Sequence, residues 1–264
     1  MKIRRVALTG VAVFALAGTI AGCDENATNG ATGSTPSASP SPSVAPKDAL
    51  LASTKSLATA SYKFTINEGG LTGTGSADGA NSKIHAAISG QEQNVSVKMD
   101  MIVVKTDLYL KMDFGALNST IGIQPDKYLH MDGTKLAANS TLPLGTSKEP
   151  VDTAGLLAGL VDVKTTDGRS YSGTVDLTKA TGDNAPAADL LQKAGDKAKS
   201  VPFTATLDDH GRLTDLKLDA SSIDPQLAFE ATFSDFGKAS GVTAPDDSEV
   251  VEAPDSVLKL FQNS

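Results

Sequence analysis

The stretch Val95-Ser96-Val97-Lys98-Met99-Asp100-Met101-Ile102-Val103-Val104 carries the pattern that decides the fold. Up to Met101 its apolar side chains occupy every second position, and the residues between them are polar: Ser96, Lys98 and Asp100. Successive side chains of a strand point to opposite faces of a sheet, so this alternation is typical of a strand with one buried face. The stretch therefore predicts a half-buried β-strand over 95–104.

Similar segments lie on both sides of this strand and are separated by short turn sequences. Glu68-Gly69-Gly70, Thr106-Asp107 and Asp132-Gly133 contain residues that favour turns. Consecutive half-buried strands with short connections form antiparallel meanders. We therefore expect further strands in this half of the chain at 62–66, 73–77, 84–88, 108–112 and 127–131.

The second half of the chain mixes strands with helical segments. Leucines and alanines at helical spacing predict helices at 48–58, 151–160 and 186–199. Asp167-Gly168 is a two-residue hairpin signal, and Asp209-His210-Gly211 is a further turn. Strands are expected at 161–166, 171–177, 201–208, 213–219 and 226–236. From Pro245 the chain is acidic and is expected on the surface, with a last short helix at 256–261. The predicted fold class is α+β, with a single long antiparallel sheet and a few helices.

The N-terminus has the features of an export signal. Lys2, Arg4 and Arg5 precede an apolar run over 6–20, which is short for a membrane-spanning helix. Leu16-Ala17-Gly18-Thr19-Ile20-Ala21-Gly22-Cys23 then resembles the bacterial lipobox, in which an aliphatic residue is followed by Ala-Gly-Cys. This predicts a lipoprotein signal peptide over 1–22 and diacylglycerol on Cys23. An ordinary signal peptide or a short membrane anchor is the alternative.

The composition after Cys23 predicts a tether and one folded domain. Residues 24–46 are rich in Ser, Thr, Pro, Ala, Asn and Gly, and such a segment buries too little apolar surface to offset its ordering entropy. The domain is therefore expected over 47–264. Because Cys23 is the only cysteine, no disulfide can form within the chain. The expected location is the outer face of the cytoplasmic membrane.

Charge and motifs argue against nucleic-acid binding and against catalysis. The formal net charge is −8, whereas nucleic-acid-binding domains are usually basic. The glycine-rich stretch over 73–79 lacks the dinucleotide-binding spacing and is interpreted as a strand and turn. The three histidines are scattered and are expected on the surface or rim: His85, His130 and His210. The sequence predicts a protein that is not an enzyme and has no cofactor and no metal site.

The order of these elements resembles the LppX/LprA/LprF/LprG family of actinobacterial lipoproteins. The segments that carry the resemblance are 57–64, 107–110, 152–160, 171–175, 201–218 and 233–237. The resemblance implies a strongly curved sheet, or half-barrel, with helices covering its concave side and a cavity that holds acyl chains. It also implies a protein that binds and carries lipids or lipoglycans in the cell envelope. The chain departs from the family in having few large aromatic residues and more Gly and Asp in its loops.

Apolar side chains on the predicted strand faces are the candidates for lining such a cavity. Each of them has plain core packing as its alternative interpretation. The alternative function is that of an envelope adaptor or sensor with a solid core, which would bind a protein partner through a sheet edge or an exposed face. The candidate lining residues are Phe64, Ile66, Val97, Met99, Met101, Leu110, Met112, Leu129, Phe203 and Phe229.

Overall fold

Twelve strands form one mostly antiparallel sheet in the computed structural model, which describes residues 44–92, 95–135, 149–182, 185–254 and 257–258. The strands are β1 (Ser61–Glu68), β2 (Leu71–Asp78), β3 (Lys83–Glu92), β4 (Val95–Val104), β5 (Asp107–Asp113), β6 (Tyr128–Asp132), β7 (Leu160–Thr165), β8 (Ser170–Val175), β9 (Val201–Leu207), β10 (Leu213–Leu218), β11 (Phe229–Ser234) and β12 (Val250–Glu252). The mixed α+β class and the large sheet are as predicted, and the strand at 95–104 is confirmed as β4.

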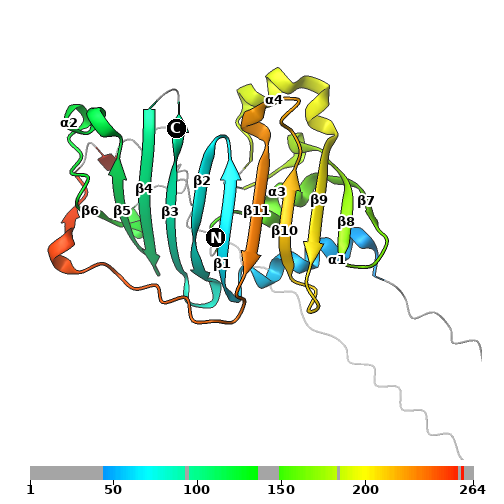
Figure 1. Ribbon diagram of the computed structural model, residues 1–264, viewed down its shortest axis with the longest axis horizontal. Coiled ribbons are helices and arrows are strands. Elements are labelled where there is room, and N and C mark those ends of the chain that lie inside the picture. The colour runs from blue at the N-terminus through cyan, green and yellow to red at the C-terminus, as the bar shows by residue number, and fades with distance from the viewer. Residues whose placement is uncertain (1–43, 93–94, 136–148, 183–184, 255–256, 259–264) are drawn as a thin grey trace, which may run out of the picture. The chain divides into compact units, whose positions relative to one another are not determined.

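Two meanders build this sheet. Strands β1 to β6 pair in chain order, and so do β7 to β11. The meanders meet where β1 pairs with β11, so that Phe64 lies opposite Phe233 (Figure 1). Within the described residues the sheet ends at β12 on one side and at β7 on the other, and these two strands are not paired with each other.

The C-terminal segment lies on the surface, as predicted, but it also forms a strand that was not predicted. It passes along the ends of the strands from β11 to β6 and there forms β12 (Figure 1). β12 is parallel to β6, with Val251 opposite Leu129. The pair is the one parallel pairing among the described strands. Three residues are too short a segment for an alternating pattern to reveal, which is why the sequence does not predict it.

The sheet has a buried inner face and a polar outer face. The pairing register aligns the inward residues of neighbouring strands with one another. Phe64 and Met101 belong to the inner face, whereas Lys63 and His85 belong to the outer face. One inward row crosses the first meander through Phe64, Gly75, Ala86, Met101, Leu110 and Leu129. A one-residue slip would move every one of these side chains to the outer face, so burial of this row fixes the register.

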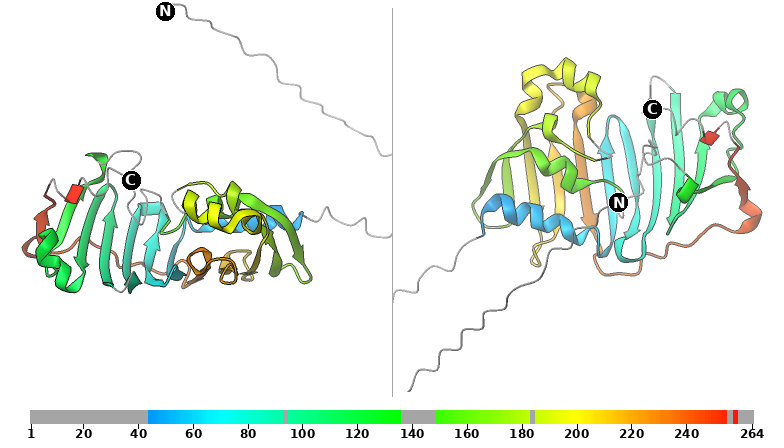
Figure 2. Two further views of the ribbon diagram at one scale, coloured as in Figure 1. Left: turned by 90° about the horizontal axis from the view of Figure 1, so that it is seen from above. Right: turned by 180° about the vertical axis from the view of Figure 1, so that it is seen from behind.

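Helices cover part of the inner face. The described α-helices are α1 (Pro46–Ser53), α2 (Asn118–Ile121), α3 (Thr153–Leu156) and α4 (Ala188–Ala194). α1 and α3 lie on one face of the sheet, over the second meander (Figure 2). Leu50 of α1 and Leu157 are fully buried there. Helices are confirmed in all three predicted segments, whereas α2 forms between the strands predicted at 108–112 and 127–131, where no helix was predicted.

Short 3-10 turns extend or connect these elements. They are η1 (Thr54–Ser56), η2 (Gly79–Asn81), η3 (Gly115–Leu117), η4 (Gly133–Lys135), η5 (Leu157–Gly159), η6 (Leu177–Lys179), η7 (Gly195–Lys199), η8 (Pro225–Leu227) and η9 (Asp247–Glu249). Several begin with an aspartate whose side chain accepts a backbone N–H bond, as Asp176 does from Thr178. In the described part of the chain, no helix is both long enough and apolar enough to cross a bilayer.

The described residues belong to one compact unit, Ser43–Ser264. The predicted signal peptide at 1–22, Cys23 and most of the predicted tether lie outside the described residues. So does most of the short helix expected at 256–261, of which 257–258 are described as helical. The signal peptide, the lipid on Cys23, the tether and the last helix therefore remain predictions.

Candidate functional site

An apolar pocket of about 280 Å³ opens on the inner face of the first meander. Its floor comes from β1, β2, β3 and β4, and its roof from residues 150–151, α4 and η8. The pocket is partly open to solvent. Its lining residues are Phe64, Ile66, Glu68, Gly69, Leu71, Gly73, Ala86, Ile88, Met99, Pro150, Val151, Leu190 and Gln226.

Gly73 creates much of this space. It lies on the inner face between Ile66 of β1 and Ile88 of β3, so the neighbouring strands both carry large side chains beside it. A Cβ atom on Gly73 would lie 3.6 Å from Ile88 Cγ1, an ordinary van der Waals distance. Its backbone also lies outside the left-handed region, so the position accepts a side chain without strain. The glycine therefore leaves a gap that the fold itself does not require.

Gly75, two residues further along β2, has a different role. It pairs with Phe64, and a Cβ atom there would lie 2.9 Å from Phe64 Cζ and 1.9 Å from the His85 carbonyl oxygen. The Phe64 ring occupies the space that a side chain would need. Gly173 of β8 stands in the same relation to Phe203 of β9.

Three of the ten predicted lining residues line the pocket: Phe64, Ile66 and Met99. The other seven are on the same inner face but are buried in the core outside the pocket: Val97, Met101, Leu110, Met112, Leu129, Phe203 and Phe229. The alternation of the strands places all ten on one face. It does not reveal which positions are roofed by other side chains and which are left open.

Two carboxyl groups near the pocket have raised pKa values. Glu68 is the last residue of β1 and faces the pocket mouth, where desolvation raises the pKa of its carboxyl group. Glu149 precedes the roof residues Pro150 and Val151, and burial, followed by the charge of Asp152, raises its pKa to about 7. Burial raises the pKa of Tyr62, and the negative charge of Glu149 raises it further. In the sequence Glu68 belongs to a turn signal, Glu68-Gly69-Gly70, but it also continues the alternation of Phe64 and Ile66, and that alternation indicates the inner face.

The outer face carries two histidine–carboxylate clusters that the sequence analysis missed. His85 Nε2 lies 3.0 Å from Asp100 Oδ1, and this contact raises the pKa of the imidazole. His130 lies 3.0 Å from Asp107 and 2.8 Å from Glu252, which together raise its pKa. The partners come from neighbouring strands, so they are close only once the register is known. Through His130, the side chains of β6 contact both β5, at Asp107, and β12, at Glu252.

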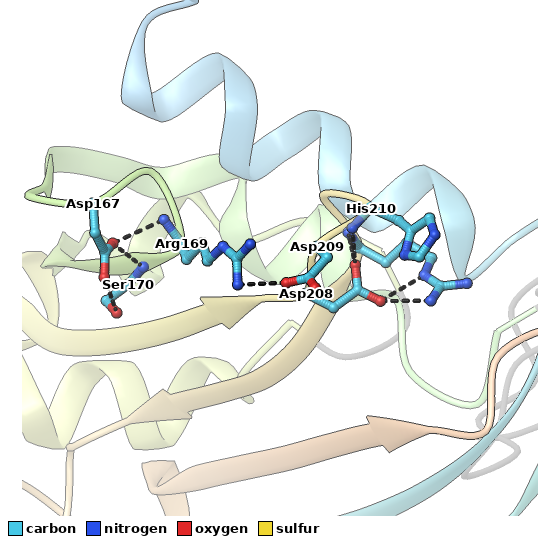
Figure 3. A network of polar contacts seen from close by, with 7 residues as sticks. Asp167, Arg169, Ser170, Asp208, Asp209 and His210 are labelled. Carbon is cyan, nitrogen blue, oxygen red and sulfur yellow. Dashed lines mark hydrogen bonds and ion pairs between the residues drawn. The ribbon is translucent and has the colours of Figure 1, made fainter.

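The two turns predicted at Asp167-Gly168 and Asp209-His210-Gly211 lie at one end of the second meander and carry several aspartates (Figure 3). Asp167 accepts hydrogen bonds from the backbone N–H groups of Ser170 and Arg169, which lower its pKa to about 2. Arg169 also forms an ion pair with Asp209 of the neighbouring turn. Asp208 accepts a bond from Arg212 Nε at 2.7 Å. These carboxylates therefore cap and join two turns.

The described residues contain no group of three or more His, Cys, Asp or Glu side chains arranged to hold a metal ion. Compared with known proteins, the chain matches no protein-family model, and no curated protein matches it significantly.

Proposed function

We propose that this protein is an exported, membrane-anchored lipoprotein that binds and carries a lipid, without catalysing a reaction on it. The observation that carries the proposal is the apolar pocket, because Glu68 is the one charged residue among the described residues that line it. An apolar pocket with few polar groups is the usual form of a site for a hydrophobic ligand. Its place beside a membrane would make lipids the ligands at hand.

Burial of an acyl chain supplies enough free energy for such a site. Each methylene group removed from water contributes about 0.8 kcal/mol. An engineered cavity of about 150 Å³ accommodates benzene, so a pocket of about 280 Å³ has room for about eleven carbon atoms. A chain of that length gains about 9 kcal/mol before the costs of association and ordering. The pocket thus fits one acyl chain of medium length.

The proposal includes a sheet that curves around the bound acyl chain as a half-barrel, with helices on the concave side. Support for this comes from the residues that share the pocket. Side chains of four consecutive strands and Leu190 of α4 line the same space. Lipoglycan ligands with several acyl chains would need the part of the roof formed by residues 150–151 to move away from the sheet.

Anchoring through Cys23 is the second part of the proposal. The Ala21-Gly22-Cys23 sequence supports it, because small residues before a cysteine are what lipoprotein processing requires. We expect Cys23→Ala to release the protein into the medium or to stop its processing. Unchanged membrane association of Cys23→Ala, measured by fractionation and immunoblot, would refute acylation.

Lipid binding is tested by filling the pocket from Gly73. The full chain with Cys23→Ala is expressed in its native host, purified from the fraction in which it is found, medium or membrane, and extracted for mass spectrometry. We expect about one acyl-chain ligand per protein molecule. Gly73→Leu should abolish the ligand without lowering the melting temperature, while Thr74→Leu, on the outer face of the same strand, should retain it. Absence of lipid from the parent protein, or equal lipid in both variants, would contradict the proposal.

A protein partner at the sheet edge is the second candidate function. β7 has a neighbour on one side only among the described strands, and Val161 on it is 59% exposed. An uncovered edge strand offers unpaired backbone groups to an incoming strand. If the protein is an adaptor, Val161→Lys should abolish cross-linking to one specific envelope protein, and Gly73→Leu should leave it intact.

A further inference from the structure

A second, polar depression adjoins the mouth of the apolar pocket. It has a volume of about 340 Å³ and shares Glu68, Gly69 and Leu71 with the pocket. Its other walls come from the end of β10, the start of β11 and η8. A molecule with its chain in the apolar pocket would therefore place its head group beside the shared residues, at Glu68.

Carboxylates dominate the charge of the depression. Three of its lining residues are acidic, Glu68, Asp219 and Glu230, and one is basic, Lys217. Lys217 lies directly opposite Glu230 on the neighbouring strand, so its charge is partly offset by that residue. The described lining of the apolar pocket adds no lysine, arginine or histidine. The mouth consequently has an excess of negative charge where the head group would lie.

Glu68 is the acidic residue shared by the pocket and the depression. It lies where apolar side chains meet the polar depression, and its side chain is exposed although desolvation raises the pKa of its carboxyl group. A cationic head group would be attracted to the ionised carboxylate, whereas a carboxylate or phosphate head group would be repelled by it at short range. Electrostatic complementarity of this kind acts mainly on specificity.

We propose that the pocket selects a single-chain lipid with a cationic, amine-type head group, held by Glu68. This inference rests on the lipid-binding function proposed above and adds the chemical class of the ligand. The alternative head groups, neutral and anionic, are outcomes of the same experiment.

Three probes with the same dodecyl chain and different head groups test the proposal. They are dodecylammonium, the dodecanoyl monoester of glycerol and dodecanoate, each used below its micelle concentration. Their affinities for the full chain carrying Cys23→Ala are measured by titration calorimetry at neutral pH and low salt. We expect dodecylammonium to bind at least about tenfold more tightly than dodecanoate, and added salt to reduce this ratio.

Variants assign the selectivity to Glu68. Glu68→Gln should reduce the ratio of the two affinities several-fold and should change the affinity for the glycerol ester much less. Glu249→Gln, an equivalent change on η9 outside both depressions, should leave the ratio unchanged. Equal or tighter binding of dodecanoate, or a ratio that Glu68→Gln does not change, overturns the selectivity and leaves lipid binding standing. If no probe binds, the proposed function itself fails.

Discussion

The two meanders use the same packing device on their inner faces, yet one is filled and the other is hollow. In the packed arm, β8 to β11, the inner-face residues Val201, Phe203, Leu213 and Leu216 are at most 2% exposed. In the pocket arm, β1 to β4, the inward Ile88 and Met99 remain partly exposed. Both arms contain a phenylalanine folded over a glycine on the adjacent strand, Phe203 over Gly173 and Phe64 over Gly75.

The comparison shows that the pocket is a local omission in an otherwise well-packed protein. A low content of large aromatic residues does not leave the packed arm loose, because α1 and α3 cover it. The pocket arises where Gly73 contributes no side chain and the roof comes from α4 and residues 150–151. Four predictions test this contrast, beginning with the largest expected effect.

Truncation of a core side chain should cost far more in the packed arm than in the pocket arm. Leu216 is 1% exposed, so Leu216→Ala should lower the free energy of unfolding by about 3 kcal/mol. Met99→Ala removes a side chain that already borders open space and should cost about 1 kcal/mol. Urea unfolding followed by circular dichroism measures both. Equal losses would mean that the two arms are packed alike.

Adding a methyl group should distinguish the glycines. Gly75→Ala and Gly173→Ala force a Cβ atom against a backbone carbonyl oxygen, and each should cost about 2 kcal/mol. Gly73→Ala should change the unfolding free energy by less than about 0.5 kcal/mol, since its Cβ atom meets no obstacle. A large loss at Gly73 in thermal unfolding would show that the gap beside Ile88 is not open.

A change of pH should act on the roof of the pocket arm through Glu149. The pKa of its carboxyl group is about 7 in the folded protein, compared with 4.5 ordinarily. The protonated form is favoured on folding, so this stabilisation is present below pH 4.5 and is lost as the pH rises through 7. The shift sets an upper limit of about 3 kcal/mol, and partial exposure reduces the expected loss to about 1–2 kcal/mol.

Glu149→Gln removes the titrating group and provides the control for that prediction. Its unfolding free energy should vary less between pH 5 and pH 8 than that of the parent protein, and its advantage should appear at the higher pH. The comparable charge removal Glu249→Gln, far from the roof, should reproduce the parent curve. A parent curve that is flat over this range would contradict the role given to Glu149.

The smallest effect is expected at the far edge of the sheet, where His130 holds β12. The raised pKa means that the stabilisation from its contacts with Asp107 and Glu252 is complete below about pH 6.5 and is lost as the pH rises through the folded-state value. Because the carboxylates are exposed, the effect should stay below about 1 kcal/mol. His130→Ala should speed hydrogen exchange at the Ala253 amide, which bonds to the His130 carbonyl. His210→Ala, in an exposed turn, should not.

Much of the fold could be predicted from the sequence because alternation is a local signal. The segments 62–66, 95–104 and 201–208 alternate over enough residues to indicate both strand and buried face. β12 could not be predicted, since Val250–Glu252 is too short and its pairing with β6 is not local. The junction of β1 with β11 was likewise invisible, because nothing near either strand specifies its partner.

The candidate site was predicted less completely for a related reason. Phe64, Ile66 and Met99 could be predicted as lining residues because they lie on an apolar strand face. Glu68 could not be assigned to them from alternation alone, because it also belongs to a turn sequence. The roof depends on where α4 and residues 150–151 lie after folding. The partners of His85 and His130 depend on register, so a carboxylate fifteen or more residues away along the chain becomes a neighbour in space.

The seam between β1 and β11 has a consequence for how the chain reaches its native state. Phe64 and Phe233 are neighbours in the sheet although about 170 residues separate them in the sequence. Each meander can assemble through hairpins between adjacent strands, whereas the seam requires closure of a loop almost as long as the folded unit. Such non-local pairing is slow compared with hairpin formation. The seam is therefore the step expected to set the folding rate, and until it forms the edges of β1 and β11 are open to other chains.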